Sequence, residues 1–124
     1  CKMKTIRIRL NERDLQHVEK LRDELQGSFV SCFSSGAITT SDTMRSIVLL
    51  GCTTLGYELM HQVEIDPTES FTLNCPAWLH KRIEFEAMGA GMGKGAYASR
   101  AFKRGLKMCA TGEQLLKRLI NNND

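Results

Sequence analysis

The feature that most constrains this chain is a short alternating segment near its start. Residues 5–10 read TIRIRL, in which Ile6, Ile8 and Leu10 share one parity. This period of two is typical of a β-strand that buries one face. A lone strand leaves backbone N–H and C=O groups unpaired along both edges. The chain must therefore supply a second strand if this segment is to be a strand at all.

The same alternation returns far downstream. Residues 70–75 read SFTLNC, with the apolar residues Phe71, Leu73 and Cys75 on one parity. Antiparallel pairing of 5–10 with 70–75 would give a two-stranded ribbon with one apolar and one polar face. The polar face would carry Thr5, Arg7, Arg9, Ser70, Thr72 and Asn74. We expect Arg7 and Arg9 to lie opposite Thr72 and Asn74.

Helix signals follow each strand. Asn11 with Asp14 predicts a helix start, and Gly27 is expected to end that helix, leaving 27–38 as a loop. TTSD at 39–42 predicts a second start, of a helix that runs to about His61. After the second strand, Pro76 suits a first helical turn, and a glycine-rich stretch, 89–95, is expected to close that helix.

The chain thus contains the order strand, helix, helix twice. A further helix is predicted over about 96–110, and Thr111 with Gln114 has the spacing of a capping box for a short last helix. Segment 41–51 corresponds to 95–105 in this scheme. The predicted organisation is a first unit over 1–62, a linker over 63–69, a second unit over 70–110 and a C-terminal helix and tail over 111–124. The two units would share one core, and the fold class is mostly α with a two-stranded antiparallel ribbon.

A ribbon of this kind fits the DNA major groove. Arginine pairs with guanine, asparagine with adenine, and serine or threonine with several base edges. At this point the chain resembles the ribbon-helix-helix DNA-binding proteins, the superfamily of the Arc and methionine repressors. The resemblance rests on the alternating strand, the amphipathic helix after it and the capped segment SDTMRSIVLLG at 41–51, and it covers about 3–110. In that family two units interlock and their strands read the bases.

The resemblance implies a set of site residues. It assigns base reading to Thr5, Arg7, Arg9, Ser70, Thr72 and Asn74. It assigns phosphate binding to the starts of the second helices and to a neighbouring lysine, namely Lys4, Thr40, Ser41, Lys94 and Gly95. Backbone N–H groups at a helix N-terminus favour phosphate in any protein. Asp42 departs from the pattern, because an acid close to phosphate must cap its own helix or turn away.

Most members of this family carry one unit and form dimers, whereas this chain resembles the minority with two, known from plasmid-transfer accessory proteins. The resemblance implies sequence-specific binding of double-stranded DNA. The role that we expect is that of a transcription regulator of a mobile element or bacterial operon. The alternatives are an accessory protein of plasmid transfer, a relaxosome component, or an antitoxin-like protein-interaction module. Because one strand has two arginines and the other has no charge, we expect an asymmetric DNA site.

Composition narrows the remaining classes of function. The formal charge is +3, and the five cysteines are widely spaced without a C-x-x-C pair, which favours buried thiols over disulfides or zinc. His17, His61 and His80 stand singly, so we expect no metal site, cofactor, small-molecule substrate or enzymatic activity. No apolar run reaches membrane-spanning length, which favours a cytoplasmic protein without a membrane partner. The resemblance to DNA-binding proteins implies in addition that it is associated with the bacterial nucleoid.

Three further expectations concern contacts. Leu115, Leu116 and Leu119 of the last helix are candidates for a homodimer contact. Trp78 and Tyr97 are expected to be packing residues. The basic residues Arg100, Lys103, Arg104 and Lys107 are expected to face solvent or a neighbouring element, with phosphate binding as the alternative.

Overall fold

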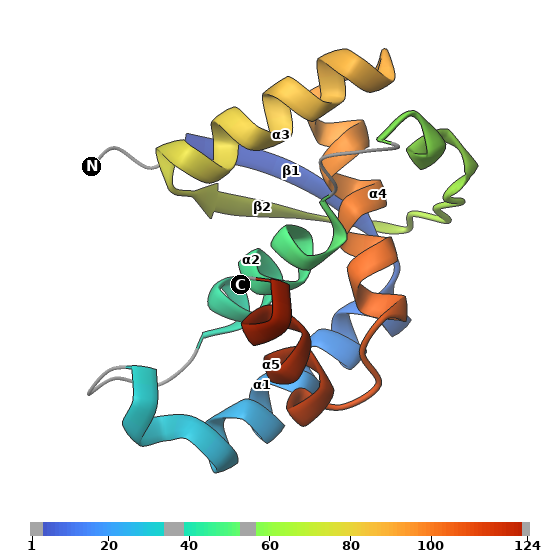
Figure 1. Ribbon diagram of the computed structural model, residues 1–124. Helices are drawn as coiled ribbons and strands as arrows, with labels where there is room; N and C mark the ends of the chain where they lie inside the picture. The colour runs from blue at the N-terminus through green and yellow to red at the C-terminus, as the bar shows by residue number, and fades with distance from the viewer. Residues whose placement is uncertain (1–3, 34–38, 53–56, 123–124) are drawn as a thin grey trace.

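The computed structural model describes residues 4–33, 39–52 and 57–122. Within these ranges, two strands and six helical segments follow one another along the chain (Figure 1). They are β1 (Lys4–Leu10), α1 (Glu12–Phe33), α2 (Thr40–Gly51), the 3₁₀ helix η1 (Tyr57–Gln62), β2 (Glu69–Cys75), α3 (Ala77–Ala90), α4 (Lys94–Lys107) and α5 (Gly112–Asn122). The described part is therefore mostly helical, with a single two-stranded sheet.

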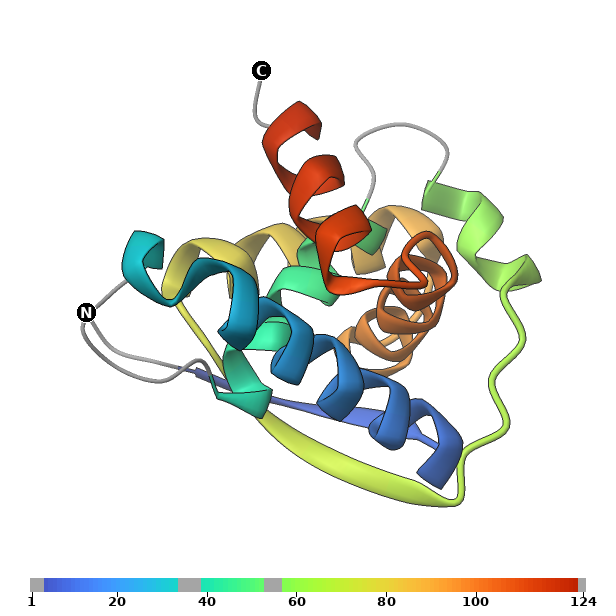
Figure 2. The same cartoon turned by 90° about the horizontal axis from the view of Figure 1, so that it is seen from below.

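The two predicted strands pair with each other, and they do so antiparallel. Their apolar side chains turn inward: Ile8 and Leu73 are fully buried, while Phe71 is half-buried. Figure 2 shows both strands along one side of the molecule, with the helices on the other. The register corrects one detail, because Arg7 lies opposite Thr72 as expected but Arg9 lies opposite Ser70. Asn74 lies opposite Thr5.

The predicted starts of the first three α-helices are confirmed. The backbone N–H of Asp14 donates to Asn11 Oδ1 at 2.8 Å. Thr39 and Asp42 form a capping box, in which the N–H of Asp42 donates to Thr39 Oγ1 and the N–H of Thr39 donates to the Asp42 carboxylate. Pro76 stands immediately before the first residue of α3. The side chains of Asn11 and Thr39 satisfy backbone donors that the first helical turn leaves without partners.

Two predicted helix ends are wrong. Gly27 does not end α1, which continues to Phe33, since one glycine costs a helix only about 1 kcal/mol. The second helix stops at Gly51 instead of reaching His61, and Cys52 after it has extended backbone angles. Thr53, Thr54 and Gly56, which are poor helix formers, follow in the sequence and lie outside the described residues. The remainder of the expected loop, 34–38, also lies outside them.

The glycine-rich stretch separates α3 from α4. Gly91 has φ +73° and ends α3 in the left-handed conformation that glycine adopts without strain. Gly93 precedes α4, which begins at Lys94, two residues before the predicted start. The last helix begins as expected, with the N–H of Gln114 donating to Thr111 Oγ1 at 3.2 Å.

Helices α2 and α4 cross in close contact at two glycines. A Cβ atom on Gly51 would lie 1.7 Å from the carbonyl oxygen of Ala101, and one on Gly105 would lie 2.1 Å from that of Ile47. Ile47 and Ala101 are fully buried in the same core. The two backbones can therefore approach this closely only because both positions lack a side chain.

We expect Gly105→Ala to destabilise the fold by about 2 to 3 kcal/mol or more, because the added methyl group overlaps backbone that cannot move without separating two helices. The free energy of unfolding in urea measures the effect. Gly93→Ser is the matched control, since a Cβ there meets nothing within 4 Å and serine is a good N-cap residue. Equal stabilities of the two variants would contradict this account of the crossing.

Candidate nucleic-acid interface

The polar face of the ribbon is open to solvent. All of its predicted base-reading residues are exposed: Thr5, Arg7, Arg9, Ser70, Thr72 and Asn74. The structure therefore brings together on one surface the six residues that the sequence assigns to one site. Among the described residues, neither the Arg7 nor the Arg9 guanidinium has a carboxylate within ion-pair distance. Both guanidinium groups are thus available to an acceptor from outside the chain.

Charge is divided unequally between the two strands. Lys4, Arg7 and Arg9 make β1 basic, whereas the only charged residue of β2 is Glu69, which is exposed opposite Leu10. Arg7 lies next to uncharged Thr72 and Arg9 next to uncharged Ser70. An anionic ligand laid along this face would accordingly be attracted mainly to β1.

Each strand of the ribbon is tied to a helix by one hydrogen bond at its edge. The backbone N–H of Arg9 donates to Ser99 Oγ of α4 at 2.8 Å, and Ser99 in turn donates to the carbonyl of Gly95 at 2.7 Å. On the other strand, the carbonyl of Asn74 accepts from Arg45 Nη1 of α2 at 2.8 Å. The sequence does not predict the roles of Ser99 and Arg45, because no local pattern shows that a serine or arginine within a helix will contact a distant strand.

The start of α4 lies close beside β1. A Cβ atom on Gly95 would be 3.2 Å from the carbonyl oxygen of Arg7, which is tighter than an ordinary contact. Lys94 is exposed at this end and lies 3.4 Å from a carboxylate oxygen of Glu84. The start of α4, with two of the predicted phosphate-binding residues, therefore adjoins the ribbon.

The start of α2 differs in its electrostatics. Thr40 and Ser41 are half-buried, and Thr40 Oγ1 accepts a hydrogen bond from Arg22 at 3.2 Å. Asp42 caps its own helix and forms an ion pair with Arg45, which was one of the two expected solutions for an acid here. Burial tends to raise the pKa of Asp42, but hydrogen bonds from Thr39 and the Arg45 guanidinium outweigh it and lower that pKa below 3.8.

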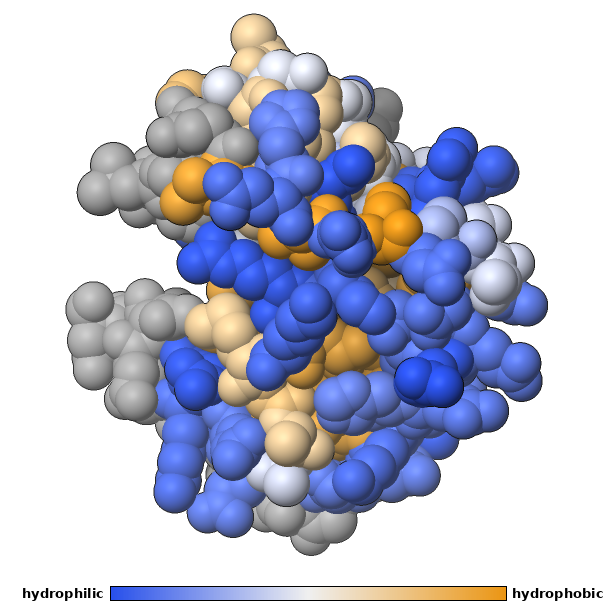
Figure 3. Space-filling view, turned by 90° about the vertical axis from the view of Figure 1, so that its right-hand side faces the viewer, coloured by the Kyte–Doolittle hydropathy of each residue, from blue (hydrophilic) through white to orange (hydrophobic). Residues whose placement is uncertain are grey.

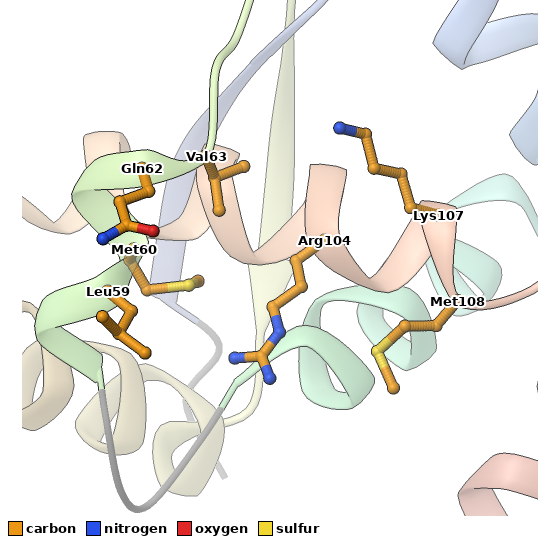
Figure 4. A pocket seen from close by; sticks show the side chains of 7 residues that line it. All are labelled: Leu59, Met60, Gln62, Val63, Arg104, Lys107 and Met108. Atoms are coloured by element: carbon orange, nitrogen blue, oxygen red, sulfur yellow. The ribbon is translucent and has the colours of Figure 1, made fainter.

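The basic residues near the end of α4 lie in another environment. Lys103 forms an ion pair with buried Asp14 at 2.9 Å, so it faces a neighbouring element as one alternative predicted. Arg104 and Lys107 line a cavity of about 440 Å³ between η1 and α4. Figure 4 shows Arg104 directed between the η1 side chains and Met108, with Lys107 pointing elsewhere. On this side of the molecule, hydrophobic residues are visible between hydrophilic ones (Figure 3).

Two buried polar side chains outside the ribbon, Glu86 and Tyr97, are partners of each other. Glu86, almost fully buried, forms an ion pair with Arg82 at 2.9 Å and accepts a hydrogen bond from Tyr97. Tyr97 packs in the core as expected, whereas Trp78 is 58% exposed and contradicts the same expectation. Leu115 is fully buried within the chain, which removes it as a homodimer contact. The side chains of Leu116 and Leu119 lie outside the described residues.

Two cysteine thiols lie in environments that disfavour the thiolate form. Burial raises the pKa of the Cys52 thiol to about 12 and that of Cys109 to about 11, so these thiols stay protonated near neutral pH. Within the described residues, no group of three or more His, Cys, Asp or Glu side chains is placed to hold a metal ion. The described helices include none long and apolar enough to span a bilayer.

Comparison with known proteins gives no relative. No family model matches this chain, and neither the curated proteins nor the solved structures contain a match to it.

We expect Asp42→Asn to lower the free energy of unfolding above about pH 4, because the variant loses the charged cap and the ion pair with Arg45. A carboxylate whose pKa is lowered by folding stabilises the protein above its unfolded pKa, and this contribution disappears as the pH falls through the lower folded pKa. Urea unfolding at a series of pH values tests this. The difference between wild type and variant should vanish at low pH, and Asp66→Asn in the exposed linker should show no such difference. A difference that persisted unchanged at low pH would contradict the assignment.

Proposed function

We propose that this chain is a tandem ribbon-helix-helix protein that binds a specific double-stranded DNA sequence through its ribbon and regulates transcription. The observation that carries the proposal is the exposed polar face of a two-stranded antiparallel ribbon, with Arg7 and Arg9 free of carboxylate partners among the described residues. A ribbon of this width fits the major groove, where exposed arginine, asparagine and threonine side chains can read base edges.

Reciprocal contacts support the idea that the two units act as a dimer within one chain. When 41–51 is aligned with 95–105, Gly51 corresponds to Gly105 and Ile47 to Ala101. Gly51 lies against the carbonyl of Ala101, and Gly105 against that of Ile47. The residues that the two glycines contact, Ile47 and Ala101, are therefore also counterparts in the alignment. Two units related by an approximate two-fold axis would make such reciprocal contacts.

The bonds at the edges of the ribbon follow the same correspondence. Arg45 of α2 holds the carbonyl of Asn74 on β2. Its counterpart Ser99 of α4 holds the N–H of Arg9 on β1, and Arg9 is the counterpart of Asn74. Each second helix thus forms a hydrogen bond with the equivalent residue of one strand. The backbone group is a donor in Arg9 and an acceptor in Asn74. This agreement favours an arrangement in which both helix starts flank the ribbon and face the DNA backbone.

The proposal also covers the form of the DNA site. Lys4, Thr40, Ser41, Lys94 and Gly95 are the proposed phosphate contacts, on β1 and at the starts of α2 and α4. Because Arg7 and Arg9 belong to one strand, the half of the site below β1 should contain the guanines, and the whole site should lack two-fold symmetry. An accessory role in plasmid transfer would use the same surface, whereas an interaction module that does not bind DNA would not.

Selection from random duplex DNA should enrich one asymmetric motif. On that motif Arg7→Ala should weaken binding by about 1 to 3 kcal/mol and relax the base preference at one position, because a guanine loses its bidentate partner. Arg118→Ala is the matched control: it removes the same charge from an exposed position on α5, a helix that lies away from the strands (Figure 2). Failure to enrich any motif, or equal losses in the two variants, would overturn the proposal.

The salt dependence of binding gives a second test. The logarithm of the association constant for the selected duplex should fall linearly with the logarithm of salt concentration, because cations are released from each phosphate that the protein neutralises. Lys94→Ala should make this slope shallower by roughly one without changing the preferred sequence. Fluorescence anisotropy of labelled duplexes at a series of salt concentrations measures both quantities. An unchanged slope would remove Lys94 from the phosphate contacts.

A further inference from the structure

Helix α3 carries large apolar side chains on its exposed side. Trp78, Phe85 and Met88 are 58%, 69% and 77% exposed, respectively. They are spaced seven and three residues apart, which places them along one face of the helix. The opposite face, with Ile83 and Ala87, is buried. We call the three exposed residues the α3 stripe.

The repeat within the chain provides an internal comparison. Alignment of 5–10 with 70–75 also aligns 12–25 of α1 with 77–90 of α3. The positions of the α3 stripe are occupied in α1 by the exposed charged residues Arg13, Lys20 and Asp23. The two helices thus present surfaces of opposite character to solvent.

The difference does not come from packing within the chain. The aligned pairs Val18 and Ile83, Leu21 and Glu86, and Leu25 and Ala90 are buried in both helices. Three corresponding positions are exposed in both, and α1 fills them with charged residues. The fold therefore tolerates charge at the positions of the α3 stripe, so its apolar residues need another explanation. An exposed apolar stripe of this kind is typical of a protein-binding surface.

We infer that the α3 stripe binds a second copy of this chain, with the two α3 helices antiparallel. A two-fold axis beside residue 83 would place Trp78 of one copy against Met88 of the other, and Phe85 against the stem and ammonium group of Lys81. Sulfur–aromatic and cation–π contacts both favour this pairing. The stripe is thus complementary to itself when one helix is reversed, as a closed dimer requires.

Charge selects the same orientation. Lys81 and Glu84 are both exposed and lie along one edge of the α3 stripe. In the antiparallel pair, Lys81 of each copy lies near Glu84 of the other, whereas a parallel pair would set lysine beside lysine and glutamate beside glutamate. Glu84 keeps access to a partner, since its ion pair with Lys94 is long, at 3.4 Å, and exposed. Because α3 has only 14 residues, the interface is small and the association weak.

The single tryptophan of the chain allows a direct test. In the absence of DNA, the mass measured by sedimentation should rise from 13.9 kDa toward twice that value between about 5 and about 500 μM protein. Over the same range, Trp78 emission should shift to shorter wavelength as its ring leaves water. A chain that stays monomeric with unchanged emission throughout would overturn the inference.

Variants taken from the repeat itself make the test specific. Phe85→Lys with Met88→Asp installs the residues of α1 at the same positions and should raise the dissociation constant about tenfold or more. Lys20→Ala with Asp23→Ala, on the corresponding face of α1, is the matched control and should associate like wild type. Thermal unfolding checks that each variant is folded. If the Phe85→Lys, Met88→Asp variant does not fold, Trp78→Gln takes its place, and its association is measured by sedimentation. Undiminished association of the α3 variants, or equal weakening in the α1 control, would contradict a contact through α3. This outcome is independent of DNA binding.

Discussion

The antiparallel pairing of β1 with β2 is the interaction on which the rest of this structure depends. The strands come from separate halves of the chain, and each would leave both of its edges open without the other. Their pairing creates a buried side, with Ile8 and Leu73, on which helices from both halves pack. It also creates the exposed side that we propose as the DNA-reading surface. Core and candidate site are thus opposite faces of one ribbon.

The close crossing of α2 and α4 holds this ribbon in place. Gly51 and Gly105 allow the two helices to touch through their backbones, and each helix then reaches one strand, through Arg45 or Ser99. Around this crossing the surfaces of the two halves differ strongly. The ribbon is basic on one strand, and the exposed helix faces are charged on α1 but apolar on α3.

The sequence predicts the parts of this structure that follow from local patterns. Alternation identified both strands, and the caps at Asn11 and Thr39 marked helix starts correctly, because each depends on residues within a few positions. The wrong or missing predictions concern features that depend on contacts with distant parts of the chain, which no local pattern records. Gly27 was expected to stop a helix that the structure continues, and Trp78 was expected in the core. The anchoring role of Ser99 depends on a strand that lies far away in the chain.

The most direct test of the central claim is amide chemical-shift mapping during titration with the selected DNA duplex. The account predicts the largest changes in 4–10 and 69–75, followed by the helix starts around 39–41 and 93–95, with little change along α5. Stronger changes on β1 than on β2 would agree with the unequal charge of the two strands. Changes centred on α5 or on the exposed face of α3, with the ribbon unaffected, would contradict the account.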